Sequence, residues 1–181
     1  MLMPFLWVAS FQTNVVLDSD EQWEILEEEM SISQEPLKDP CKLLSSAEIE
    51  STDGFENSSE GILHKASGNT YKQCDFLVDK RQMGVVFRRL NQKEIELKKL
   101  ESNYKFYLKQ DAYTEVENVP GDQAMFSFTQ TKSPSGVKYA YSLQWRYGNH
   151  TERKIGISYA DEQNRSDVLS SLVELANKLE D

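Results

Sequence analysis

An alternating run over residues 137–147 constrains the fold of this chain more than any other stretch of its sequence. Aromatic or aliphatic side chains take every second position, and basic, polar or small side chains take the positions between them. Successive side chains of a strand point to opposite faces of a sheet, so the run predicts a central antiparallel strand with one buried face. The side chains expected on the buried face are Val137, Tyr139, Tyr141, Leu143, Trp145 and Tyr147.

Three shorter strand patterns accompany this run, at 112–119, 123–129 and 153–159. Short segments rich in Gly, Pro, Ser and Asn separate them, and such connections favour hairpins. The sequence therefore predicts an antiparallel meander over 112–159. Earlier segments with strand character lie at 61–65, 71–78 and 83–90.

Two short helical turns are expected before these strands. Pro40 after Asp39 is a helix-start pattern, and Glu48 three positions after Ser45 forms a capping box. Gly54 is the expected stop of the second turn.

Two longer helices are expected later in the chain. An apolar stripe at helical spacing predicts a helix from about 166 to 179, and a second stripe predicts one over 91–107. Helices packed on an antiparallel sheet define the α+β class, so we expect an α+β domain.

Charge is unevenly distributed along the chain, whose formal net charge is -10. Residues 16–60 hold fourteen acidic and two basic side chains, whereas the part from residue 61 onward holds sixteen acidic and eighteen basic ones. An acidic segment broken by Ser and Pro is typical of a solvated linker. We therefore expect an acidic linker at 17–36 and a single domain at 37–181.

Residues 1–16 carry no charged side chain. Their apolar start and the small residues Val8, Ala9 and Ser10 indicate a secretory signal peptide, although no basic residue precedes the run. The alternative is an ordinary edge strand. No apolar run reaches the length of about 20 residues that a membrane span needs, so no span is expected.

Composition also bears on the partner. The acidic balance disfavours nucleic acid and anionic lipid, which leaves a protein or a small molecule, with the oligomeric state open. Neither G-x-S-x-G, a Walker loop nor a dinucleotide fingerprint occurs in the sequence. The two cysteines and two histidines lack the spacing of zinc ligands. We therefore expect no enzyme activity, no cofactor and no metal, and an enzyme of unknown type is the least favoured hypothesis.

Two features are candidate binding sites. Lys138, Gln144 and Arg146 lie on the side of the central run opposite the aromatic set, and Lys154 belongs to the same side of the neighbouring strand. If no helix covers this face, it is a basic, polar surface suited to an acidic partner. Asp122 lies in a Pro-Gly-Asp-Gln turn and is the candidate functional carboxylate, although such turn carboxylates more often bond nearby backbone N–H groups.

Cys41 and Cys74 are the only cysteines of the chain. In a cytosolic protein they would be buried free thiols, and in an exported protein they would form a disulfide. A disulfide closing a loop of this length contributes about 3–4 kcal/mol in the chain-entropy model. The residues alone leave both states open.

The segment D-P-C-K-L-L-S-S-A-E-I-E, followed by C-D-F and later by G-D-Q-A, resembles a group of small bacterial extracytoplasmic proteins and lipoproteins of unknown function. The matching residues are Asp39, Pro40, Cys41, Leu43, Leu44, Ser45, Glu48, Ile49, Cys74, Gly121, Asp122, Gln123 and Ala124. Met125 stands where the group has an aromatic residue, and the acylated cysteine of the lipoproteins is absent. The resemblance covers 37–179 and implies a PsbP-like α/β/α sandwich with a disulfide between the two cysteines.

The expected function is that of a non-enzymatic exported binding or accessory domain, located in the periplasm or outside the cell. The alternative is a cytoplasmic interaction or immunity-type protein in which both cysteines are reduced. The two hypotheses differ in the state of the cysteines and in the fate of the apolar N-terminus.

Overall fold

The computed structural model describes residues 36–65, 70–90, 113–134, 136–148 and 151–179. The expectations for 1–16, for nearly all of 17–36 and for the helix at 91–107 lie outside the described residues. The division of the chain into leader, linker and domain stays a prediction.

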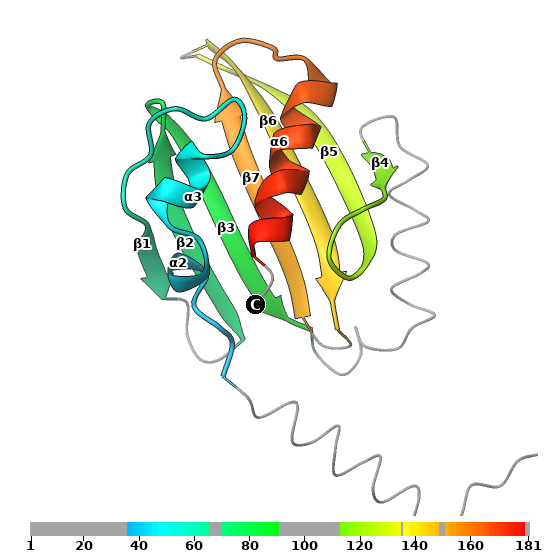
Figure 1. The fold of residues 1–181 in the computed structure, drawn as a ribbon. Coiled ribbons are helices and arrows are strands. Elements are labelled where there is room, and N and C mark those ends of the chain that lie inside the picture. The colour runs from blue at the N-terminus through cyan, green and yellow to red at the C-terminus, as the bar shows by residue number, and fades with distance from the viewer. Residues whose placement is uncertain (1–35, 66–69, 91–112, 135, 149–150, 180–181) are drawn as a thin grey trace, which may run out of the picture. The chain divides into compact units, whose positions relative to one another are not determined.

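The described residues form an open antiparallel sheet of seven strands, in the order β1-β2-β3-β7-β6-β5-β4 (Figure 1). All neighbouring pairs are antiparallel. The strands are β1 (Ile62–Lys65), β2 (Tyr71–Val78), β3 (Arg81–Arg89), β4 (Tyr113–Val116), β5 (Asp122–Ser133), β6 (Gly136–Tyr147) and β7 (Thr151–Tyr159). The predicted antiparallel sheet is therefore confirmed.

The meander forms as expected, since β4, β5, β6 and β7 are neighbours in chain order. The middle strand of the seven is β7 and not β6, because β3 joins the meander along the free side of β7. The predicted strand at 112–119 is shorter in the structure, where β4 ends at Val116. The strand predicted at 123–129 is longer and extends to Ser133.

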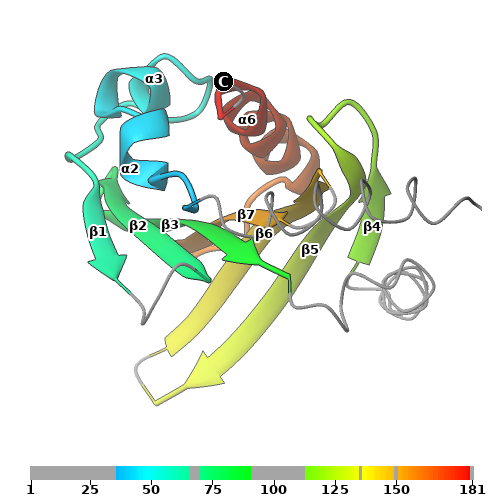
Figure 2. The same ribbon diagram turned by 90° about the horizontal axis from the view of Figure 1, so that it is seen from below.

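The described helices are α2 (Pro40–Leu43), α3 (Ser46–Glu50) and α6 (Arg165–Lys178). All three lie on one face of the sheet, as the view along the sheet shows (Figure 2). We call this the inner face and the opposite one the outer face. A second helix layer is not among the described residues, so the α/β/α arrangement is not confirmed. Among the helices of the described segments, none combines the length and apolar character that a membrane crossing requires.

The core lies between the inner face and these helices. Alternate side chains of β6, namely Tyr141, Leu143 and Trp145, are 1% exposed or less, as the sequence pattern predicts. Neighbouring strands contribute Cys74, Phe76, Val78, Met83, Val85, Phe87, Ile155 and Ile157. Aromatic rings continue the core towards the N-terminal end of α6, where Tyr141 meets Tyr159 edge to face at 5.5 Å between centroids.

Helix α6 covers the middle of the inner face. Its N-cap is Asn164, whose side chain accepts a hydrogen bond from the Ser166 N–H at 2.9 Å. The predicted stripe is buried, and its members are Val168, Leu172, Leu175, Ala176 and Leu179. Fully burying a Leu or Val side chain contributes about 1.5–3 kcal/mol, so apolar contacts dominate the docking of this helix.

A buried arginine caps the other end of α6. Arg153 is 3% exposed, and its Nη1 donates to the Leu179 carbonyl oxygen at 2.6 Å. The guanidinium also lies over the rings of Phe87 and Tyr147, at 4.6 Å and 3.6 Å from the ring centroids. The negative end of the helix dipole and the two π-faces replace the water that this cation loses on burial.

The β5–β6 hairpin extends beyond its neighbours. Pairing between β6 and β7 ends at Tyr139, and pairing between β4 and β5 ends at Tyr113 opposite Ser127. Val137 lies beyond both limits and is 38% exposed, so its predicted burial is wrong. The alternation holds along the strand, but a residue is buried only where helices or neighbouring strands cover it.

Candidate functional site

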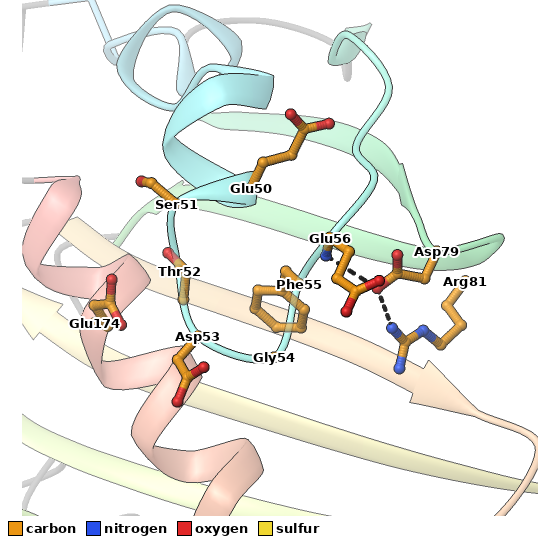
Figure 3. A pocket seen from close by; sticks show the side chains of 10 residues that line it. All are labelled: Glu50, Ser51, Thr52, Asp53, Gly54, Phe55, Glu56, Asp79, Arg81 and Glu174. Atoms are coloured by element: carbon orange, nitrogen blue, oxygen red, sulfur yellow. Dashed lines mark hydrogen bonds and ion pairs between the residues drawn. The ribbon is translucent and has the colours of Figure 1, made fainter.

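A cleft with a volume of about 780 Å³ lies where three segments meet (Figure 3). Its lining consists of residues 50–56, Asp79 and Arg81 at the β2–β3 turn, and Glu174 on α6. Most of this wall belongs to residues 45–57, which comprise the N-cap of α3, the helix itself and the loop after it. We call residues 45–57 the strap.

Local sequence signals set the course of the strap. The Ser45 hydroxyl accepts a hydrogen bond from the Glu48 N–H at 3.3 Å, and the Glu48 carboxylate accepts one from the Ser45 N–H at 2.7 Å. This is the predicted capping box. The helix ends at Glu50, before the predicted stop, and Gly54 serves the following turn with a φ of +86°. Phe55 then enters the core and is 2% exposed.

Asp79 fixes the C-terminal end of the strap to the β2–β3 turn. Its carboxylate accepts hydrogen bonds from the Asn57 N–H at 3.0 Å, the Asn57 side-chain amide at 3.2 Å and the Glu56 N–H at 3.4 Å. Arg81 also pairs with this carboxylate. Burial by itself would raise the pKa of Asp79, but the bonds from Asn57, Glu56 and Arg81 outweigh it and lower the pKa.

Glu174 fixes the middle of the strap to α6. Its carboxylate pairs with Lys178 one helical turn away, at 2.8 Å, and that contact is the largest cause of a lowered pKa of Glu174. The Asp53 backbone and the Thr52 side chain also lower the pKa, whereas burial opposes them. The Thr52 hydroxyl donates to the Glu48 carbonyl oxygen at 3.1 Å. The Ser171 hydroxyl adds a bond to the Asp53 carbonyl oxygen at 2.7 Å.

Lys178 joins α6 to the C-terminal part of α3. Its ammonium donates to the Glu48 carbonyl oxygen at 3.0 Å, to the Ser51 hydroxyl at 3.0 Å and to the buried Thr52 hydroxyl at 2.6 Å. A cation placed against the last carbonyl groups of a helix also opposes their partial negative charge. The strap is therefore held by polar groups from two other elements, α6 and the β2–β3 turn.

The cleft is electronegative. Five carboxylates and one guanidinium line it, from Glu50, Asp53, Glu56, Asp79, Glu174 and Arg81. Glu50 accepts a hydrogen bond from the Ser58 N–H at 2.8 Å and so contributes to the fold as well. Such a lining repels anionic ligands. Within the described residues, no group of three or more His, Cys, Asp or Glu side chains is arranged to hold a metal ion.

The predicted binding residues lie elsewhere, on the outer face. Gln144 is opposite Lys154 in the β6–β7 register, and Lys138 is opposite Thr131 near the end of the hairpin. Lys138 and Lys154 are exposed. Lys154 lies beside Gln144, and two positions of the same face of β6, Ala140 and Ser142, separate Gln144 from Lys138. The two lysines therefore do not form one cluster. Binding of a partner at this face stays a prediction.

Arg146 does not contribute to an exposed basic surface on the outer face, contrary to the prediction from the sequence pattern. It is 4% exposed, and its Nε donates to the Gly148 carbonyl oxygen at 3.2 Å. In register it stands between Asp122 on β5 and Glu152 on β7, and Glu152 in turn pairs with Arg88 at 3.1 Å. Opposite charges at neighbouring positions across strands stabilise a sheet, so the place of Arg146 opposite Glu152 favours a role in the fold. A buried guanidinium does not present its charge to a partner.

Asp122 is the first residue of β5 and is not part of the cleft. The turn before it is tightly constrained: Gly121 has a φ of +97°, and a Cβ there would overlap the carbonyl oxygen of Arg146. Gln123 also has a positive φ, of +53°, and the β5–β6 register shifts between Asp122 and Met125. The functional role expected for Asp122 stays a prediction.

Cys41 and Cys74 form a disulfide with a Cα–Cα distance of 5.3 Å. Asp39 is the N-cap of α2, and its carboxylate accepts a hydrogen bond from the Cys41 N–H at 3.0 Å, as the Asp-Pro pattern predicts. Cys74 is fully buried in β2. The bridge therefore links the first described helix to the inner face.

Sequence reasoning did not single out Asp79, Arg81 or Glu174. The strand patterns at 71–78 and 83–90 bracket a tight turn, but no local signal indicates which segment that turn meets. Glu174 reads as an ordinary solvent-facing position of an amphipathic helix. These residues become a site only through the packing of α6 and the strap on the sheet.

No protein-family model, curated protein or solved structure matches this chain. The resemblance to bacterial extracytoplasmic proteins therefore stays a prediction. The described geometry defines the class as an antiparallel-sheet domain with helices on its inner face, one disulfide and an acidic cleft.

Proposed function

We propose that this chain is a non-enzymatic binding or accessory domain that works in the periplasm or outside the cell. The observation that carries the proposal is the disulfide between Cys41 and Cys74. Stable structural disulfides belong to oxidising compartments, whereas cytosolic thiols are kept reduced. The apolar, uncharged start of the chain supports export by the same reasoning.

The chemistry of the cleft favours binding over catalysis. A general acid or base that works near neutral pH needs a pKa moved towards neutrality. The carboxyl groups of Asp79 and Glu174 instead have lowered pKa values and are occupied by backbone and side-chain donors of the strap. No His or Cys is among the residues that line the cleft. Its negative charge disfavours phosphate-bearing ligands, so a protein or an uncharged or cationic small molecule is the ligand class.

The PsbP-like α/β/α sandwich is the architecture that accompanies this proposal. Helices on the inner face supply one of its two outer layers. The centre of the outer face supports a second layer, because Gly84, Gly156 and Ser142 are cross-strand neighbours there. Small side chains allow another layer to approach the sheet closely.

The test is the intact mass of the protein expressed with an untagged N-terminus in a host with a secretion pathway. The proposal predicts loss of the apolar leader near Ser10 and a mass deficit of about two daltons relative to the reduced chain. A Cys41→Ala/Cys74→Ala variant is the matched control and shows no deficit. An intact N-terminus with two alkylatable thiols would instead support the cytoplasmic interaction or immunity-type protein.

A further inference from the structure

Three carboxyl groups of the described residues have clearly lowered pKa values, and all three hold the strap. Glu48 lies within it, Asp79 bonds its C-terminal end and Glu174 bonds its middle. The strap forms one wall of the cleft. Acid-sensitive contacts are thus concentrated on a single segment of the fold.

We propose that the strap is an acid-released wall of the cleft, held closed by the carboxylates of Glu48, Asp79 and Glu174 and opened when these groups are protonated. Release means that the polar contacts of the loop at 51–57 with the β2–β3 turn and with α6 break, while Phe55 stays buried and the sheet stays folded. The cleft therefore has one shape near neutral pH and another in acid.

At the β2–β3 turn, the closed state depends on the charge of Asp79. The groups that face this carboxylate are Arg81 on β3, Glu56 on the strap and Tyr159 on β7, whose own pKa burial raises. Two backbone N–H groups of the strap donate to the carboxylate. Protonation removes the ion pair with Arg81 and leaves a weaker acceptor for both N–H groups.

On α6, Glu174 faces Lys178 of its own helix and Asp53 and Thr52 of the strap. Protonation of Glu174 removes the ion pair that positions Lys178, which itself bonds the strap at three oxygen atoms. One proton therefore weakens both the direct and the indirect contacts of α6 with the strap.

At the start of the strap, Glu48 faces Ser45 and, from α6, Lys178. Hydrogen bonds from the side chain and backbone of Ser45 are the main causes of the lowered pKa of Glu48. Protonation of this group weakens the cap of a helix that is only five residues long. A helix this short depends on its cap and its packing, because isolated short helices are unstable in water.

The direction of the pH dependence follows from these lowered pKa values. A carboxyl group with a lower pKa in the folded state stabilises the fold above its ordinary pKa of about 4. That stabilisation decreases as the pH falls through the lower pKa of the folded state. The strap is therefore closed near neutral pH, and its open state gains population as the pH falls below the ordinary carboxyl pKa, because the open state then binds protons more readily than the closed state.

Several contacts confine the opening to the strap. Ile49 and Phe55 are buried in the core and carry no titratable group. Upstream of the strap, the disulfide at Cys41 keeps α2 on the sheet at any pH. Local opening of polar contacts around an apolar anchor has a lower free energy than global unfolding.

The experiment measures amide hydrogen exchange at neutral pH in variants that imitate protonation. Asp79→Asn keeps the shape of the side chain, and Asn tolerates the positive φ of this residue. Glu174→Gln likewise keeps the shape of the side chain on α6. We expect each to lower the protection of amides 53–57 by about tenfold, because a hydrogen bond to a charged group is replaced by a neutral one. Amides of α6 and β6 should stay much better protected than those of the strap in both variants, because they exchange through global unfolding and the strap exchanges through a local opening of lower free energy.

Glu162→Gln is the matched control, because Glu162 pairs with Arg165, the first residue of α6, and is not among the residues that line the cleft. Unchanged protection at 53–57 in both test variants would overturn the proposal. Strap amides as well protected as those of β6 would also overturn it, because the strap would then open only in global unfolding. The wild type, exchanged at neutral pH and in acid and compared as protection factors, provides the same test without a substitution.

Discussion

Helix α6 and the strap cover the same face of the sheet, but different forces hold them there. The contacts of α6 with the sheet are mainly apolar, and Leu172 and Leu175 have no exposed surface. The strap contributes Ile49 and Phe55 to the core, but its loop is bonded to its neighbours by carboxylates, an ammonium and hydroxyl groups. Apolar burial does not depend on pH, whereas hydrogen bonds to carboxylates do.

This difference between apolar and charged attachment indicates which part of the fold can change shape. A segment held by charge can be released by one or two protons, while a segment held by apolar area cannot. The disulfide is a third kind of attachment, a covalent one, which fixes α2 to β2 just before the strap begins. Most residues that line the cleft belong to the strap, the segment whose polar contacts respond to pH.

The largest effect is expected for the apolar packing of α6 on the sheet. Leu172→Ala removes a fully buried side chain and leaves a cavity under α6. We expect a loss of about 3–5 kcal/mol in the free energy of unfolding, with the same value at neutral and acidic pH. Urea denaturation at both pH values measures it. Asn177→Ala, at an exposed position of the same helix, is the control. A loss below about 1 kcal/mol would mean that α6 does not depend on apolar packing.

The next effect concerns the covalent link. Cys41→Ala with Cys74→Ala removes a bridge across a sequence separation of 33 residues. We expect the free energy of unfolding to fall by about 3–4 kcal/mol, since the unfolded chain regains the freedom of an open loop. Thermal unfolding in the presence and absence of a reductant gives the same comparison for the wild type. A melting temperature that does not respond to reductant would contradict this account of the bridge.

A smaller effect tests the packing around the bridge. A Cβ at Gly61 would overlap the Cys74 sulfur and lie 2.7 Å from the Phe76 ring. Gly61→Ala should lower the free energy of unfolding by about 1–3 kcal/mol, as overpacking does. Gly156→Ala is the control, because the atom nearest to a Cβ at that position would be 3.6 Å away. Equal effects of the two substitutions would contradict the close contact at Gly61.

A still smaller effect is expected for the charged contacts of the strap. Asp79→Asn should cost about 1–2 kcal/mol at neutral pH, because charge-assisted bonds to the strap become neutral ones. In acid the wild type has lost the same contribution, so the difference between the two proteins should shrink as the pH falls. Urea denaturation across this pH range measures the difference. A constant difference between neutral pH and about pH 3 would show that Asp79 stabilises the fold without its charge.

The smallest effect is expected at a surface ion pair. Glu162 and Arg165 are both about half exposed and are 3.4 Å apart. Glu162→Gln should change the free energy of unfolding by less than about 0.5 kcal/mol, because solvent and salt screen exposed pairs. Denaturation at low and high salt is the measurement. A loss as large as that of Asp79→Asn would mean that exposure does not separate the two kinds of carboxylate.

Much of the sheet follows from the sequence because period-2 alternation is a local signal. Tyr141, Leu143 and Trp145 are buried where the pattern places them, and Ser45 with Glu48 forms the capping box that their spacing predicts. The α6 stripe is equally clear. These features depend on neighbours within a few residues, and the sequence contains that information directly.

The candidate site does not follow from the sequence because it depends on distant contacts. Asp79 and Asn57 are 22 residues apart, and Lys178 bonds Thr52 over a separation of 126 residues. Arg146 shows the same limitation: its place in the alternation predicts exposure, yet cross-strand neighbours and burial remove it from the surface. Which charged side chains are structural is decided by tertiary packing and not by local pattern.

The most direct test of the central claim is hydrogen exchange of the wild-type protein at a series of pH values from 7 to about 3, with protection factors corrected for the chemical exchange rate. We predict that amides 53–57 lose protection as the carboxyl groups titrate, and that amides of α6 and β6 stay better protected than the strap at every pH. Strap amides that exchange at the same rate as those of α6 and β6, or strap protection that stays constant with pH, would contradict the claim that hydrogen bonds to carboxylates hold this wall of the cleft closed.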